Sequence, residues 1–202
     1  MKKSDTKAPV LLFFLIGAMI ILAFLALVVV DFADRSHQRI SVLGEVPDFK
    51  FTNQYNQSFG RKDLNGKMSV VSFMFTRCKS ICPVMSDNIY QLYKFYDHSD
   101  KLQFISITVD PANDTVLQLA HYADSLGVND QRWIFLYANL EKIVDLSENG
   151  FMIAADDLPG GHSTRMVLVD QYGRIRSYHN GMDLDDIELL KNEINTLGRE
   201  LK

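Results

Sequence analysis

Cysteine is scarce in this chain of 202 residues, which contains only Cys78 and Cys82. Two thiolates are too few for a structural zinc site, which takes four ligands. Basic residues are in the minority, because residues 31–202 hold 18 Lys and Arg against 24 Asp and Glu, a net charge of −6. They form no basic stripe, and we therefore expect no nucleic-acid partner. Internal repeats and low-complexity segments are also absent, which leaves one ordinary domain with an additional N-terminal segment.

The N-terminal segment carries no charge between residues 8 and 30, a run of 23 residues. At 1.5 Å per residue, a helix of this length can cross a hydrocarbon core of about 30 Å. A secretory signal peptide has a shorter apolar core, of about 7–15 residues, and a small-residue cleavage site after it. No such site precedes Asp31. We therefore predict that residues 1–30 are a short cytoplasmic tail and an uncleaved transmembrane helix.

The charges on either side of this segment predict its orientation. Lys2, Lys3 and Lys7 precede the apolar run, whereas Asp31 and Asp34 follow it. Positively charged flanks stay on the cytoplasmic side. The short tail also lacks the Arg-rich amphipathic pattern of a mitochondrial transit peptide. We predict a single-pass protein of the bacterial inner membrane, with its C-terminal domain in the periplasm, where disulfides can form.

The rest of the chain predicts an α/β fold. Residues 31–46 are weakly patterned and are interpreted as a tether before a domain at 47–202. A hairpin is expected at 47–59, and Asp114, Asn139 and Asp183 are expected to cap helices. Apolar runs that predict strands alternate with runs of helical spacing, and this pattern indicates a sheet covered on both faces. The expected strands are 69–75, 104–109, 133–137, 166–169 and 175–178.

The two cysteines lie in a turn between a strand and a helix. They follow the uncharged strand 69–75, and Pro83 after them suits the first position of a helix. The partial positive charge of a helix N-terminus lowers the pKa of a nearby thiol. The thiolate is the form that binds metals and exchanges disulfides. This position therefore indicates reactive thiols.

Three roles for Cys78 and Cys82 compete. A structural disulfide across so short a loop would remove little entropy from the unfolded chain. Redox catalysts of the thioredoxin type have two residues between their cysteines, and this pair has three. A metal site is the third role, because two thiolates select Cu(I) or Zn(II).

A third ligand would favour copper, and the candidates are His37, His98, His121, His162 and His179. His162 is singled out because it lies in a Gly-rich loop before strand 166–169, which we expect at the same sheet edge as the thiols. A loop histidine alone is more often a surface residue, so this expectation depends on the thiols. Met74 and Met85 could add soft ligands, but a core role is expected for both.

Three ordered motifs show a resemblance to a known family. They are FMFTRCKSICP at residues 73–83, TVDPANDT at 108–115 and GHS at 161–163 before a strand. With the single N-terminal anchor, they resemble the Sco/SenC family of membrane-anchored copper proteins, over about residues 47–201. The chain differs from the family pattern at Lys79, where many members have Pro, and at Gly160-Gly161, where the usual Asp before the His is missing.

This resemblance implies a thioredoxin-like fold and a copper site, Cu(I) or Cu(II), formed by Cys78, Cys82 and His162, with Asp110 as a supporting residue. It implies a copper chaperone that assists assembly of the dinuclear copper centre of cytochrome c oxidase. The partners would be the copper-bearing oxidase subunit and a second periplasmic copper donor. The alternative is an enzyme, a periplasmic thiol–disulfide oxidoreductase in which Cys78 and Cys82 are catalytic and reduce the cysteines of a client protein.

Overall fold

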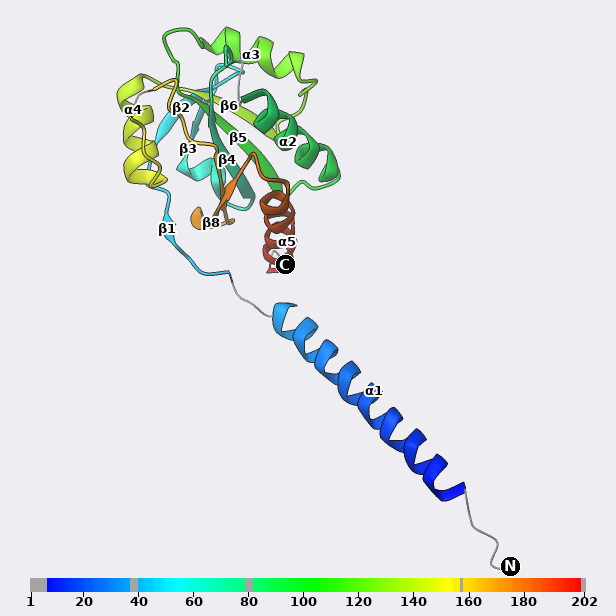
Figure 1. Ribbon diagram of the computed structural model, residues 1–202. Helices are drawn as coiled ribbons and strands as arrows, with labels where there is room; N and C mark the ends of the chain where they lie inside the picture. The colour runs from blue at the N-terminus through cyan, green and yellow to red at the C-terminus, as the bar shows by residue number, and fades with distance from the viewer. Residues whose placement is uncertain (1–6, 37–39, 79–81, 157, 201–202) are drawn as a thin grey trace, which may run out of the picture. The chain divides into compact units, whose positions relative to one another are not determined.

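The computed structural model describes residues 7–36, 40–78, 82–156 and 158–200 (Figure 1). The chain forms two compact units, Met1–Arg39 and Ile40–Lys202. The first unit contains helix α1, Lys7–Ser36, which includes the segment predicted to be helical at 8–30. Side chains of α1 are described over residues 15–29, and its large apolar ones there are exposed. Among the described residues, no helix is long and apolar enough to cross a membrane.

The second unit begins earlier than the predicted domain start at residue 47. Residues 44 and 45 form strand β1 (Gly44–Glu45), which pairs antiparallel with β8. The Leu43 N–H donates to the Ile175 carbonyl at 2.8 Å, and Val46 is buried. Part of the segment expected to be a tether is therefore an edge strand of the sheet.

The second unit is built on one eight-stranded mixed sheet with the order β1-β8-β7-β4-β5-β6-β2-β3. The remaining strands are β2 (Lys50–Asn53), β3 (Ser58–Gly60), β4 (Met68–Met74), β5 (Leu102–Thr108), β6 (Trp133–Tyr137), β7 (Arg165–Val169) and β8 (Arg174–Asn180). The helical segments are η1 (Arg61–Leu64), α2 (Cys82–Phe95), α3 (Val116–Ser125), α4 (Leu140–Asp145), η2 (Leu146–Gly150) and α5 (Leu184–Glu200). This arrangement confirms the expected α/β class.

Strands β4 and β5 form the centre of the sheet, and every residue in both is buried. They pair in parallel, and β5 also pairs in parallel with β6. Strand β7 runs antiparallel to β4. Uncharged runs of this kind are typical of strands buried on both faces, as the sequence predicted.

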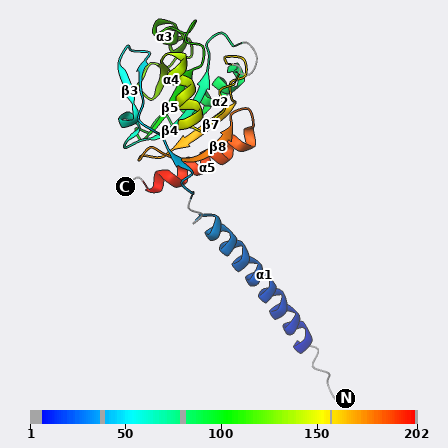
Figure 2. The same ribbon diagram turned by 90° about the vertical axis from the view of Figure 1, so that its left-hand side faces the viewer.

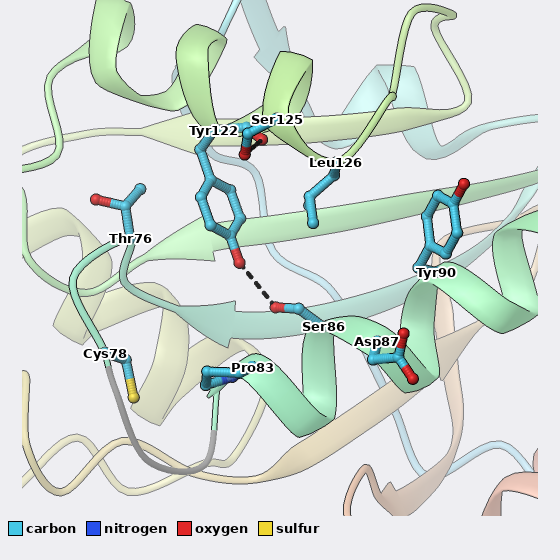
Figure 3. A pocket seen from close by; sticks show the side chains of 9 residues that line it. All are labelled: Thr76, Cys78, Pro83, Ser86, Asp87, Tyr90, Tyr122, Ser125 and Leu126. Atoms are coloured by element: carbon cyan, nitrogen blue, oxygen red, sulfur yellow. Dashed lines mark hydrogen bonds between the residues drawn. The ribbon is translucent and has the colours of Figure 1, made fainter.

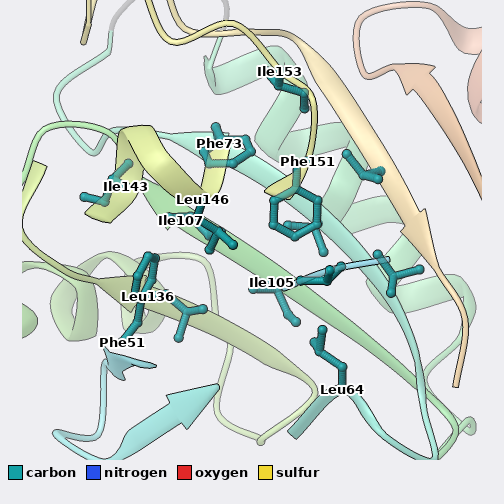
Figure 4. Close-up of a cluster of buried hydrophobic side chains, with 14 of the residues drawn as sticks. Phe51, Leu64, Phe73, Ile105, Ile107, Leu136, Ile143, Leu146, Phe151 and Ile153 are labelled. Carbon is teal, nitrogen blue, oxygen red and sulfur yellow. The ribbon is translucent and has the colours of Figure 1, made fainter. Parts of the chain in front are cut away.

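Each face of the sheet has its own hydrophobic core. One core includes Phe73 from β4 and Ile143 from α4 (Figure 4). The other includes Val70 from β4 with apolar residues of α2, α3 and α5. Because successive side chains of a strand point to opposite faces, β4 supplies residues to both cores. Figure 2 shows α4 lying across one face of the sheet.

The predicted helix caps were confirmed at two of three positions. Asn139 accepts a hydrogen bond from the Lys142 N–H at 3.1 Å, and Asp183 accepts one from the Asp185 N–H at 3.0 Å. The prediction for Asp114 was wrong, because Thr115 caps α3 by accepting from the Gln118 N–H. The carboxylate of Asp114 is engaged elsewhere, at the edge of the sheet that carries the cysteines.

Candidate functional site

The sheet topology brings the three sequence motifs to one edge. Strand β4 ends at Met74, which pairs with Thr108 at the end of β5. Strand β7 is antiparallel to β4, with Met166 opposite Ser72, so its first residues lie at the edge where β4 ends. The loops that carry Cys78, Asp110 and His162 therefore meet at this edge. The His162 loop reaches this edge because it precedes β7, a strand that runs antiparallel to β4.

His162 is a buried side chain with only 5% of its surface exposed. Its ring packs edge-on against Phe75, with the ring centroids 5.4 Å apart and the planes at 88°. The Phe75 carbonyl accepts a hydrogen bond from the Cys78 N–H at 3.3 Å. Phe75 therefore links the His162 ring to the backbone of the cysteine turn.

The hydrogen bond at Nδ1 defines the chemistry available to His162. Nδ1 lies 3.2 Å from the Ser163 carbonyl oxygen, a group that can only accept. A neutral ring that donates from Nδ1 carries its lone pair on Nε2. Ligating histidines commonly use this arrangement, because a hydrogen bond at the other ring nitrogen fixes the tautomer and the ring orientation. The tautomer that donates from Nδ1 is therefore one in which His162 can serve as a metal ligand.

Cys78 is partly buried and lines a pocket of about 500 Å³ together with Thr76 and Pro83 (Figure 3). Cys82 is the first residue of α2. Its side chain and residues 79–81 lie outside the described part of the chain. Within that part, no group of three or more His, Cys, Asp or Glu side chains is placed to hold a metal ion.

Asp110, predicted to be a supporting residue, forms an ion pair with Arg77, the residue before Cys78. Its carboxylate is 7% exposed and lies 3.6 Å from the Arg77 guanidinium. Both of its oxygens accept hydrogen bonds from the Asn113 amide, at 2.8 and 2.9 Å. Arg77 is itself 63% exposed, so the ion pair contributes about 1 kcal/mol at most to stability.

Asp114 is the residue that the sequence argument missed. It is completely buried, and its carboxylate accepts from the Thr76 N–H at 3.0 Å, the Thr76 hydroxyl at 2.5 Å and the Thr108 hydroxyl at 2.6 Å. These bonds fasten Thr76, which lies two residues after β4 and two residues before Cys78, to the end of β5. The presence of Thr115 next to it, which can cap α3 as well, was the one local signal that Asp114 had another role.

The remaining histidines have different environments. His98 is 96% exposed and His121 is exposed, as predicted for solvated positions, while His37 lies outside the described residues. His179 was expected just after a strand, but β8 extends to Asn180 and includes it. Met74 and Met85 are buried, as expected for core residues.

His179 is a structural histidine. Its Nδ1 lies 2.7 Å from Asp186 and its Nε2 lies 2.9 Å from Glu193, so both ring nitrogens are engaged. Burial alone would lower the pKa of His179, but the hydrogen bonds to Glu193 and Asp186 raise that pKa overall. An imidazole held between two carboxylates ties β8 to α5, and neither of its ring nitrogens faces the cysteines.

Comparison with known proteins agrees with this geometry. A family model described as SCO1/SenC matches residues 39–197. The crystal structure of a SCO1/SenC family lipoprotein from Bacillus anthracis is 31% identical, with a TM-score of 0.70 over 77% of this chain and 95% of that one. BsSco, a member of the Sco family of cytochrome c oxidase assembly proteins in which a disulfide switch was identified, is 26% identical. Its TM-score is 0.71 over 79% of this chain and 98% of its own.

A further structure, Bradyrhizobium japonicum ScoI with copper bound, is 24% identical. The match covers 73% of this chain and 98% of ScoI, with a TM-score of 0.61, and it shows that the two folds are alike. The expected thioredoxin-like domain is thus confirmed. Because the family model spans most of the second unit and the structures match over its length, the chain belongs to the SCO1/SenC family.

Proposed function

We propose that this protein is a copper chaperone that binds copper through Cys78, Cys82 and His162. Its cargo would be delivered to the copper-bearing subunit of cytochrome c oxidase, for assembly of the dinuclear copper centre. The observation that carries the proposal is the buried His162, which packs on Phe75 at the sheet edge of the cysteine turn. A histidine buried at this position is not needed for thiol exchange, whereas a copper site can use it as a ligand.

The donor set fits copper in both of its common oxidation states. Two thiolates satisfy Cu(I), which is soft and accepts two or three ligands, whereas imidazole favours Cu(II). Cys82 begins α2, and the partial positive charge at this helix end favours the thiolate form. The copper-bound ScoI structure and the oxidase-assembly family of BsSco support this assignment.

The proposal places the protein at the bacterial inner membrane, with the second unit in the periplasm. Residues 8–30 carry no charge, belong to α1 and present exposed apolar side chains where these are described. Lysines precede this segment and aspartates follow it, as the positive-inside rule requires for this orientation. The periplasmic location would also supply a copper donor and an oxidising environment for the thiols.

A second function, thiol–disulfide oxidoreductase, is favoured by the disulfide switch identified in BsSco. In this reaction a thiolate of the pair attacks a client disulfide and forms a mixed disulfide. The second cysteine then displaces the client thiolate, so that two electrons pass to the client and Cys78 and Cys82 become a disulfide. Both functions can use the same turn, and His162 distinguishes them.

The test measures copper stoichiometry and affinity on the purified full-length protein. One copper per chain is expected for wild type with either oxidation state. His162→Ala should weaken Cu(II) binding by about 10–100-fold, the loss typical when a metal ligand loses its hydrogen-bond partner. It should weaken Cu(I) binding less. His121→Ala, on an exposed position of α3, is the matched control.

Unchanged copper affinities in His162→Ala, with losses in His121→Ala or His98→Ala, would show that the third ligand was misassigned. A wild-type protein that binds no copper but reduces a disulfide-bonded peptide would support the oxidoreductase instead.

A further inference from the structure

The pocket beside Cys78 lies between two helices that each present a regular stripe of side chains (Figure 3). Helix α2 contributes Pro83, Ser86, Asp87 and Tyr90. The first and the last of these each lie three or four residues from the middle pair. Residues with this spacing share one face of a helix. The stripe starts next to Cys78 and leads away from it along α2.

Helix α3 and its end supply the opposite wall. Tyr122, Ser125 and Leu126 have the same helical spacing and line the pocket. The hydroxyls of Tyr122 and Ser86 lie 3.0 Å apart in a hydrogen bond that joins the two helices, drawn as a dashed line in Figure 3. The pocket is therefore a built feature of the fold, connected to the cysteine turn at one end.

The lining of the pocket is complementary to a positive charge. Among the described residues that line it, Asp87 is the only charged one, and Tyr90 and Tyr122 add two aromatic rings. Asp87 is exposed, and no salt bridge engages it among the described residues. An ammonium or guanidinium group is attracted both by a carboxylate and by the face of an aromatic ring.

We propose that this pocket binds a lysine or arginine side chain of the client protein, close in sequence to the client cysteine that meets Cys78. This inference rests on the proposed function, because it requires a client whose cysteines approach the thiol pair. Both copper transfer and thiol exchange bring client and protein sulfur atoms together. The pocket would then select the client and fix its register before the sulfur chemistry takes place.

The helix geometry gives the spacing of that cationic residue. Asp87 lies four residues beyond Pro83, which corresponds to about 6 Å along a helix axis. An extended client chain advances about 3.3 Å per residue. Because Pro83 lines the pocket beside Cys78, the cationic residue should lie about two positions from the client cysteine.

The test uses copper-free, reduced full-length protein and synthetic peptides that contain one cysteine. The peptide cysteine is activated as a disulfide with thionitrobenzoate. A protein thiolate attacks the peptide sulfur, the peptide–protein disulfide forms, and thionitrobenzoate leaves as a coloured anion. The activated disulfide is the oxidant, so no other reagent is needed. Peptides differ only in carrying Lys or Glu two residues before or after the cysteine.

We expect the Lys peptide in one of the two arrangements to reach half-saturation at about fivefold lower concentration than its Glu counterpart. Exposed Arg77 and the neighbouring Lys79 would by themselves favour the Glu peptide, so a Lys preference cannot come from them. Asp87→Asn should abolish the preference, and Asp87→Lys should reverse it. Glu141→Gln removes an exposed carboxylate on α4, over the other core, and should leave the preference intact.

Tyr90 tests the aromatic contribution. Tyr90→Phe keeps the ring and should keep most of the Lys preference, whereas Tyr90→Leu should reduce it. The proposal is overturned if the Asp87 variants keep the wild-type ratio of Lys to Glu half-saturation. It is also overturned if they change the maximal rate equally for every peptide, because Asp87 would then act on the thiols.

The two hypotheses fail separately in these experiments. A Lys preference that depends on Asp87, in a protein that binds no copper, would remove the chaperone function and leave the docking site standing. Normal copper binding without a Lys preference would remove the docking site alone.

Discussion

The buried carboxylate of Asp114 should hold the cysteine turn in place, and its replacement should affect both stability and thiol chemistry. Asp114 accepts three hydrogen bonds from Thr76 and Thr108, and Thr76 lies two residues before Cys78. The Thr108 hydroxyl is fully buried and already accepts from the Asp110 N–H, so it has no route to water as a donor. Removal of the carboxylate therefore leaves a buried donor unsatisfied.

The expected magnitude follows from these bonds. Each hydrogen bond to a charged group contributes about 1.5–3 kcal/mol. Thr76 is only half-buried and can recover part of its loss by binding water. We expect Asp114→Ala to lower the free energy of unfolding by about 3–5 kcal/mol. Asp114→Asn keeps the size and one carbonyl oxygen, and its amide can donate to a threonine hydroxyl, so it should cost about 1–2 kcal/mol.

The assay combines urea unfolding with a measurement of the reduction potential of the Cys78–Cys82 pair in glutathione buffers. A looser turn lowers the effective concentration of one thiol at the other and makes the disulfide easier to reduce. A three- to tenfold change in the exchange equilibrium corresponds to a rise of about 15–30 mV for Asp114→Asn. Copper affinity should fall in the same variant.

Asp170 is the matched control for this experiment. It is also completely buried, and it binds Arg174 and Arg176, each at 2.8 Å. It follows Val169, which pairs with Ser69 at the start of β4, and so lies at the opposite sheet edge. Asp170→Asn should lower stability without moving the potential. If Asp114→Asn behaves in the same way, Asp114 only stabilises the fold and the reasoning is refuted.

Two further predictions concern pH dependence and topology. Because the folded-state pKa of His179 is raised above the ordinary value of 6.5, its stabilising contribution is present in full below about pH 6.5. This contribution is lost as the pH rises through the folded pKa. The urea midpoint of the wild type should therefore fall as the pH rises through the folded pKa of His179, and it should fall less in His179→Gln. An equal pH dependence of the two midpoints would show that the charged ring contributes nothing to stability. A reporter that is active only in the periplasm, fused after Lys202, should be active, and a cytoplasmic reporter should be silent. The opposite pattern would contradict the proposed orientation.

Local patterns in the sequence were sufficient to predict most elements of the fold. The uncharged run at 69–75 corresponds to β4 at Met68–Met74, because a strand buried on both faces has no place for a charge. Asn139 caps α4 as predicted, because the cap bond joins residues three positions apart. The start of α2 at Cys82 was also predictable, since Pro83 suits the first turn of a helix.

The tertiary structure alone decided how the site is supported. Asp114 reaches Thr76 across 38 positions of sequence, and its neighbour Thr115 competes for the cap that a local argument assigns to Asp114. His162 is buried because Phe75 packs against it, and the antiparallel course of β7 brings its loop to the cysteine edge. Such contacts depend on strand order and register, which arise from the packing of the whole sheet and leave no short-range pattern in the chain.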